Sequence, residues 1–158
     1  SKLVETYPNI EAYIEQLWPK KEQVLQLKLK GESNISFYQI EGEIRFMEIR
    51  DYPLLPMLRV LLRYPNLMGE PMVVDKGAIR HIFSGSHIMA PGLTHENGSL
   101  VQGLDKMAPV AVFAEGKEHP ICIGVTSMSS KEIATENKGQ AIEVVQFYND
   151  GIWFLRPV

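Results

Sequence analysis

The residues whose types could hold a metal ion are the histidines and the single cysteine: His81, His87, His95, His119 and Cys122. A zinc site needs ligands at tight spacing, such as C-x-x-C or H-x-x-x-H. His81 and His87 lie six positions apart across a glycine, and Cys122 has no second ligand near it in the sequence. We therefore expect no metal centre, and we interpret Cys122, which lies in an apolar run, as a core thiol.

The segment Ser84-Gly85-Ser86-His87 carries the serines that come nearest to a nucleophile. Acyl-transfer serines stand in a G-x-S-x-G elbow or an equivalent turn, and this segment does not match that pattern. Nucleotide-binding loops need Walker A or GxGxxG spacing, which the glycines of residues 73–93 lack. The sequence therefore predicts a protein that is not an enzyme and needs no cofactor.

The same stretch carries groups suited to the end of a polynucleotide. Backbone N–H groups around Gly85, Ser86 and Gly92 could contact phosphates or splayed bases at close range. Three cations could pair with phosphates: Lys76, Arg80 and Lys117. Recognition of single-stranded RNA depends on exposed bases held by backbone and stacking contacts, with little demand for net charge. Residues 73–93 are therefore interpreted as a surface that grips a partner rather than one that performs chemistry.

Local signals predict how this stretch is built. Val73 and Val74 are expected to form a short strand, and Asp75 to Gly77 a polar turn. Ile79, Ile82 and Phe83 have the i, i+3, i+4 spacing of a short helix seated on a core. A segment rich in glycine and proline, residues 84–92, follows the helix.

Composition narrows the class of protein. The chain has 158 residues, 45% of them hydrophobic, and a net charge of −3, which counts against non-specific nucleic-acid binding through a large positive field. One cysteine excludes an intrachain disulfide and favours a reducing compartment. No apolar run approaches the roughly 20 residues that span a bilayer. We expect one or two globular domains in a cytoplasmic protein that makes no membrane contact.

The first half is predicted to be helix, three antiparallel strands, then helix. Residues 9–18 have helical periodicity, with Asn9 as N-cap and Pro19 as the stop. Alternating leucines after residue 25 indicate a half-buried strand, and short turns at 31–34 and 41–42 lead into two more. The strands are expected at residues 25–30, 35–40 and 44–49. A second helix is expected after Pro53 and Pro56, with an inner face of Leu55, Leu58, Leu61 and Leu62 and a stop at Pro65.

The second half is predicted to be a small mixed barrel or sheet with short helices. After a polar loop at 94–103, the apolar runs 109–114 and 121–125 suggest a hairpin with a charged tip. Ser129 and Glu132 form a capping-box signature that opens a helix closed by Gly139. Asn149-Asp150-Gly151 is expected to turn a hairpin between residues 142–148 and 152–155. The class is therefore α+β, with a first domain at 1–70, a second at 71–158, and a connector at Pro65–Pro71.

The run VDKGAIRHIFSGSHIMAPGL is similar to the opening of PUA domains, the RNA-binding fold named after pseudouridine synthases and archaeosine transglycosylases. The whole chain resembles the malignant T-cell-amplified sequence family, and also the N-terminal part of ligatin. Further matching motifs are Tyr7-Pro8, Trp18-Pro19-Lys20-Lys21, Leu58-Arg59, Tyr64-Pro65, Ala114-Glu115-Gly116-Lys117, Gly124-Val125, Asn137-Lys138-Gly139 and Tyr148-Asn149-Asp150-Gly151-Ile152-Trp153. Family members usually carry a further N-terminal segment, so this chain is expected to be truncated there.

The resemblance implies a non-enzymatic translation factor. It would pair with a homologue of density-regulated protein, bind the small ribosomal subunit and its rRNA, and hold the acceptor end of tRNA. Its roles would be non-canonical initiation, reinitiation and recycling. By position, the resemblance puts Gly85, Ser86, Met89, Gly92 and Leu93 on the RNA groove with Lys117 beside it, and Lys76 and Arg80 on phosphates.

Two positions depart from the family pattern. Ser86 stands where many relatives carry a small residue such as alanine, and its hydroxyl could alter the contact with a base. His81 stands where relatives carry an aromatic or another residue, which affects the partner contact of that helix position. Two other functions stay open at this point. One is an adaptor whose RNA affinity is small because the chain is acidic, and the other is a targeting module of an RNA-modification complex.

Overall fold

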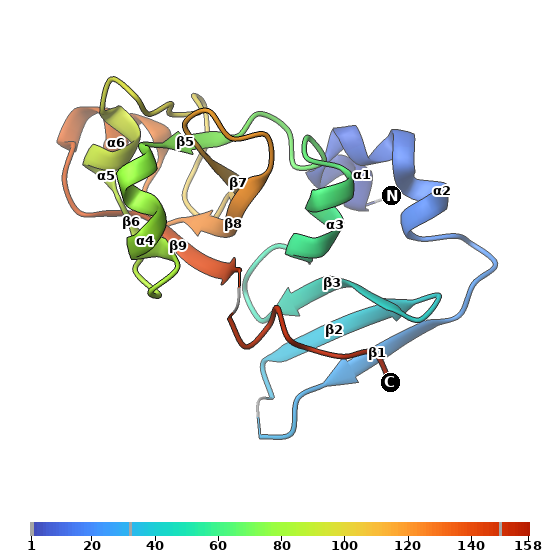
Figure 1. Ribbon diagram of the computed structural model, residues 1–158. Coiled ribbons are helices and arrows are strands. Elements are labelled where there is room, and N and C mark those ends of the chain that lie inside the picture. Colours follow the sequence, from blue (N-terminus) through green and yellow to red (C-terminus); the bar gives the residue numbers. More distant parts are fainter. Residues whose placement is uncertain (1, 32, 149) are drawn as a thin grey trace.

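The chain forms two sheets with α3 (Leu58–Arg63) lying between them (Figure 1). The computed structural model describes residues 2–31, 33–148 and 150–158. The first sheet has the order β1-β2-β3-β4, and the second has the order β5-β7-β8-β9-β6. The predicted α+β class, with a helix–meander–helix unit followed by a small mixed sheet, is confirmed. Among the described residues, no helix has the length and apolar character that crossing a membrane requires.

The N-terminal helices differ from the single helix expected at residues 9–18. After α1 (Lys2–Thr6), the chain forms the 3₁₀ helix η1 (Pro8–Tyr13) and then one α turn, α2 (Ile14–Leu17). Asn9 does not cap a helix, because its side-chain amide donates to the carbonyl of Asn66 at 2.8 Å. The predicted stop is confirmed, since α2 ends two residues before Pro19.

The predicted antiparallel meander is confirmed. Strands β1 (Val24–Lys28), β2 (Ile35–Ile40) and β3 (Glu43–Ile49) pair in sequence. A fourth strand, β4 (Leu55–Pro56), was not expected; it pairs with β3. The second helix therefore begins at Leu58 and not at Leu55, because the residues expected in its first turn extend the sheet. Glu32, in the turn predicted at residues 31–34, lies outside the described residues.

The second half builds a curled sheet with short helices on it (Figure 1). Only the pairing of β5 with β7 is parallel; the other pairings of this sheet are antiparallel. The capping box of α6 is present, with Ser129 and the Glu132 side chain bonding each other's backbone N–H groups. Left-handed Asn137, and not Gly139, ends that helix. The elements are β5 (Met72–Val74), η2 (Lys76–Ala78), α4 (Ile79–Ile82), β6 (Ile88–Met89), α5 (Ala90–Thr94), β7 (Pro109–Ala114), β8 (Pro120–Thr126), α6 (Ser130–Glu136) and β9 (Gln140–Phe147).

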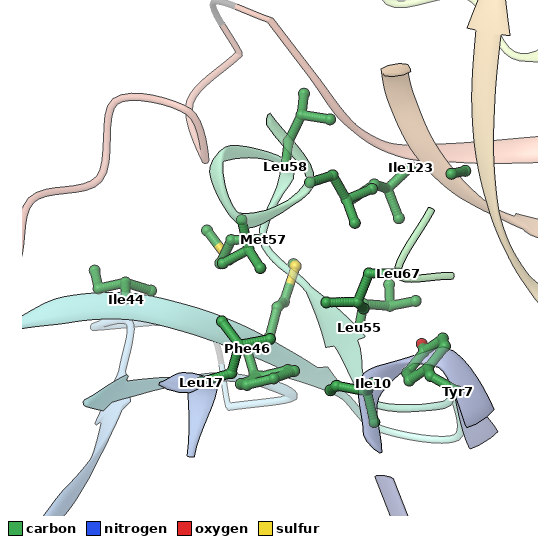
Figure 2. Packing of buried hydrophobic residues seen from close by; sticks show 14 of the residues in the cluster. Tyr7, Ile10, Leu17, Ile44, Phe46, Leu55, Met57, Leu58, Leu67 and Ile123 are labelled. Carbon is green, nitrogen blue, oxygen red and sulfur yellow. The ribbon is translucent and has the colours of Figure 1, made fainter. Parts of the chain in front are cut away.

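The β7–β8 hairpin is buried on both faces. Val112 and Cys122 belong to a core beneath the short helices of the second half. Phe113 and Ile123 belong to the larger core of the first half, and Figure 2 shows Ile123 directed toward Leu58 and Leu67 of that half. A strand covered on both faces needs apolar residues throughout, which explains why residues 109–114 and 121–125 are unbroken apolar runs. The two halves are therefore joined by this hairpin, which contributes one face to each of two cores.

The C-terminal hairpin predicted after residue 148 is wrong. The carboxylate of Asp150 accepts the N–H groups of Phe147 and Trp153, at 2.9 and 2.6 Å, and this forms a local turn in place of a second strand. Asn149, at the centre of that prediction, lies outside the described residues. The chain then runs back over the first sheet (Figure 1). There Val158 exchanges two hydrogen bonds of 2.9 Å with the side chain of Gln39.

Two side chains of β9 join it to the first half. Gln146 is buried; its Oε1 accepts the N–H of Leu58 at 2.9 Å, and its Nε2 donates to the carbonyl of Pro56 at 3.0 Å. The carboxylate of Glu143 accepts from the hydroxyl of Tyr52, and that hydrogen bond raises the pKa of Tyr52 to about 12. Gln146 thereby satisfies two backbone groups at the start of α3 that would otherwise be buried without partners.

Replacing Gln146 tests how much this link stabilises the fold. Gln146→Leu leaves the N–H of Leu58 and the carbonyl of Pro56 unpaired, at a cost of about 1–3 kcal/mol for each buried group. We expect the free energy of unfolding, measured by urea denaturation, to fall by roughly 2–4 kcal/mol. Gln23→Leu, at an exposed glutamine, is the matched control. Equal losses in the two variants would show that the link does not stabilise the fold.

Candidate nucleic-acid interface

A hollow of about 330 Å³ opens between the two edge strands of the second sheet. Val74 at the end of β5 and Ile88 in β6 both line it. These strands are the outermost in the order β5-β7-β8-β9-β6, so the curl of the sheet brings its two edges to one site. Helices α4 and α5 supply the rest of the wall. The full lining is Val74, Ala78, His81, Ile82, Ser86, His87, Ile88, Met89 and Gly92.

The wall of the hollow is mostly apolar, with a few polar groups at the loop between α4 and β6. The side chain of Met89 is 51% exposed, although its neighbours Ile88 and Ala90 are buried. Gly92 lies inside α5, and a Cβ placed on it would meet no described atom within 4 Å, so it faces open space. A concave, apolar site with few polar groups suits an aromatic or otherwise planar ligand group.

The loop over the hollow is folded by its own backbone. The N–H of Gly85 donates to the carbonyl of Ile82 at 3.0 Å, and the N–H of Ser86 donates to the carbonyl of His81 at 3.0 Å. Gly85 has φ of +94°, a conformation that side-chain-bearing residues rarely adopt. These two donors, proposed from sequence as contacts for a ligand, are therefore used within the protein.

His81 and His87 line the hollow. Sequence analysis considered His87 only as a metal ligand, and His81 also as a departure from the family pattern. The Nδ1 atom of His87 accepts the N–H of Val144 in β9 at 2.9 Å. With Nδ1 accepting this bond, Nε2 is the ring nitrogen that can donate. His87 therefore ties the loop to the sheet and keeps one donor for a further partner. The signal in the sequence that could have placed His81 and His87 at the site was their position on either side of the Ser84–Ser86 loop.

The turn before α4 is fixed by Asp75. Its carboxylate accepts the N–H of Gly77 at 3.1 Å and the side-chain amide of Asn97 at 3.3 Å. These donors, the Gly77 N–H first, lower the pKa of Asp75 below its ordinary value. Lys76 and Arg80 follow on this turn and helix, and both are exposed. Lys76 and Arg80 therefore place two positive charges at the surface of η2 and α4, beside the hollow.

The structure brings some of the predicted site residues together and separates others. Ser86, Met89 and Gly92 line the hollow, and exposed Gly85 stands in the loop beside it. Leu93 does not line it, because its side chain is 1% exposed and belongs to the core under α5. Leu93 therefore seats the helix that carries Gly92.

Lys117 is exposed at the tip of the β7–β8 hairpin and does not line the hollow. The N–H of Glu115 donates to the carbonyl of Val74 at 2.8 Å, which holds the tip beside the turn that begins at Asp75. Glu115 and Glu118 flank Lys117 in sequence. The tip therefore carries mixed charge, and Lys76 and Arg80 dominate the positive side of the site.

Family models match the chain in two consecutive parts. A pre-PUA-like domain matches residues 1–65, and a PUA domain matches residues 71–148. The hollow and all of its lining residues fall within the PUA match.

Curated relatives match nearly the full length. Translation machinery-associated protein 20 of Schizosaccharomyces pombe is 41% identical over 153 residues, which cover 97% of this chain and 83% of the relative. Malignant T-cell-amplified sequence 2 of Homo sapiens is 40% identical over 157 residues, which cover 99% of this chain and 84% of the relative. The chain belongs to the malignant T-cell-amplified sequence family. The resemblance found in the sequence is confirmed.

Solved structures show the same fold as this member of the malignant T-cell-amplified sequence family. A hypothetical protein from Pyrococcus horikoshii OT3 superposes with a TM-score of 0.68 at 24% identity, covering 97% of this chain and 95% of that chain. A PUA domain protein from Aeropyrum pernix K1 superposes with a TM-score of 0.67 at 21% identity, covering 96% and 82%. Family membership and the PUA domain together support an RNA-binding, translation-associated role without catalysis.

Titration of Asp75 tests the turn that presents Lys76. Because the carboxylate gains donors on folding, its folded pKa lies below the ordinary value of about 3.9. The stability it contributes is present above the unfolded pKa and is lost as the pH falls through the folded pKa. NMR titration of the Asp75 carboxyl carbon should give a lowered midpoint, which Asn97→Ala raises. Asn66→Ala, at an exposed asparagine, is the control; an Asp75 midpoint unmoved by Asn97→Ala would contradict the assignment.

Proposed function

We propose that this protein is a non-enzymatic translation factor that holds the single-stranded acceptor end of tRNA in the hollow between α4, β6 and α5. It acts in the cytoplasm on the small ribosomal subunit, in non-canonical initiation, reinitiation and recycling. The observation that carries the proposal is the apolar hollow lined by Ser86, Met89 and Gly92, with Lys76 exposed on η2 and Arg80 exposed on α4.

The chemistry of the hollow favours an RNA end over a duplex. Sequence-specific recognition of RNA usually targets unpaired bases, which are splayed out and placed on apolar or aromatic surfaces. The apolar wall and the open space over Gly92 suit a base, and Nε2 of His87 offers a hydrogen-bond donor. The exposed cations beside the hollow are Lys76 and Arg80, and the net charge of the whole chain is −3. Affinity then comes from base contacts more than from a general positive field.

The partners of the proposal rest on family membership. Relatives named as translation machinery-associated support a place on the ribosome. A homologue of density-regulated protein is the proposed protein partner, and the small subunit's rRNA is the proposed second RNA contact. Lys117, at the mixed-charge hairpin tip, is the proposed outer contact to the tRNA phosphates, and the Gly85 loop bounds the RNA groove.

Removing the unpaired end of tRNA tests the proposal directly. Fluorescence anisotropy with tRNA should show tighter binding than with tRNA that lacks its terminal CCA nucleotides. Ser86→Asp places a carboxylate beside the RNA, and the repulsion should weaken binding of intact tRNA by about tenfold or more. Ser33→Asp, at an exposed serine of the first half, is the control. Equal affinity for the two tRNAs would refute binding at the acceptor end.

Gly92→Ala separates binding from stability. The added methyl group enters open space inside α5, so the free energy of unfolding should stay unchanged or rise by up to about 1 kcal/mol. The same methyl group narrows the hollow, so affinity for the tRNA end should fall by about fivefold or more. Gly151→Ala is the matched control, because a Cβ there also meets no described atom within 4 Å and Gly151 does not line the hollow. Unchanged affinity in Gly92→Ala would contradict the placement of the RNA.

The acidic charge balance favours one other function, a protein-binding adaptor with little RNA affinity of its own. Both functions predict that density-regulated protein is retained in a pull-down. Only the RNA-binding function predicts that tRNA binding by the full chain depends on the CCA end and on Ser86. Retained assembly without measurable RNA binding would favour the adaptor.

A further inference from the structure

Phe83 is an exposed aromatic side chain at the end of α4. It follows the last residue of that helix and precedes the Ser84–His87 loop that borders the hollow. Its side chain is 39% exposed, in a chain whose other large phenylalanines are mostly core residues, such as Phe37 and Phe46. An aromatic ring beside an opening for RNA offers a face on which a base could stack.

The ring of Phe83 packs against another aromatic ring. It meets the ring of Tyr148 edge to face, with centroids 5.7 Å apart and planes at 83°. Tyr148 is fixed in turn, because its hydroxyl donates to the carbonyl of Pro120 at 2.7 Å and its ring meets Trp153 at 5.0 Å. The guanidinium of Arg59 lies 3.8 Å from the centre of the Trp153 ring. A ring supported in this way loses little entropy when a ligand stacks on it.

Two cations precede the ring in the same stretch of chain. Arg80 in α4 stands three residues before Phe83, a spacing that places two side chains on one face of an α-helix. Lys76 begins the 3₁₀ helix η2 that leads into α4. Both cations are exposed. Aromatic side chains interleaved with cations are the pattern that proteins use for single strands, with the cations on phosphates and the rings on bases.

We propose that Phe83 is a stacking site for an unpaired nucleobase of the RNA strand whose end occupies the hollow. The proposal rests on the proposed function, and it adds a second base position outside the hollow. The strand would leave the hollow across the Ser84–His87 loop, stack one base on Phe83, and pass its phosphates along Arg80 and Lys76. The chemical class of ligand is a single-stranded RNA segment, so a base-paired segment would gain nothing from this ring.

The experiment combines protein variants with RNA that lacks one base. Fluorescence anisotropy would measure the binding of a short single-stranded RNA ending in CCA, and of copies in which one nucleotide near the 3′ end is abasic. The proteins are the full chain, Phe83→Leu, Phe83→Trp, and the control Phe154→Leu at another exposed phenylalanine. Phe83→Leu removes the edge-to-face contact with Tyr148, so a circular dichroism melt should show a folded protein whose unfolding temperature is only slightly lower than that of the unchanged chain.

The expected result is a loss of about five- to a hundredfold in affinity for Phe83→Leu, the range of one base–aromatic stack. Phe83→Trp and Phe154→Leu should bind like the unchanged protein. For one abasic position, the unchanged protein should bind the abasic RNA more weakly than the intact RNA by the same factor. Phe83→Leu should bind that abasic RNA and the intact RNA equally, because the protein change and the RNA change remove the same contact.

Two outcomes would overturn the proposal, and they are distinguishable. If the unchanged protein prefers the CCA end but Phe83→Leu binds as well as it does, the stacking site is wrong and the proposed function stands. If the unchanged protein binds no RNA end at all, both the proposed function and the stacking site fail.

Discussion

Burial of the β7–β8 hairpin on both faces is the constraint on which the rest of the structure depends. One face completes the core beneath the short helices of the second half, and the other completes the core of the first half through Phe113 and Ile123. Separating the two halves would expose apolar surface to water, and this exposure costs about 25 cal/mol of free energy for each Å². The buried amide of Gln146 and the chain that returns to Gln39 reinforce the same contact. The second half, which carries the hollow, is therefore attached to the first half through buried contacts.

The same hairpin also positions the proposed RNA groove. Strand β5 pairs with β7, and the tip after β7 is bonded to the end of β5. On the other side, β8 pairs with β9, and β9 pairs with β6. The edge strands β5 and β6 are thus connected through the hydrogen-bonded strands β7, β8 and β9, and both edge strands line the hollow. Small helices that could not be stable alone are seated there by core residues such as Ile82 and Leu93.

Sequence reasoning found the elements whose signals are local. The meander, the β7–β8 hairpin and the capping box of α6 follow from alternation, apolar runs and cap chemistry. It missed β6 and α5, because residues 84–92 were described only as a segment rich in glycine and proline, although proline is favoured in the first turn of a helix. It was wrong after Tyr148, because the Asp150 carboxylate satisfies backbone donors and forms a different turn. The hollow itself depends on the closure of the sheet, which no local pattern contains, and so the burial of Leu93 and the place of His87 could not be read from the sequence.

The most direct test of the central claim is to locate the end of a bound tRNA. A tRNA with a photoreactive base at its 3′-terminal nucleotide would be bound to the full chain and irradiated, and the linked peptide would be identified by mass spectrometry. We expect the crosslinks to fall between residues 76 and 93, on α4, the following loop, β6 and α5. Crosslinks confined to the first half, on the face of the β1–β4 sheet, would contradict the claim that the hollow holds the RNA end.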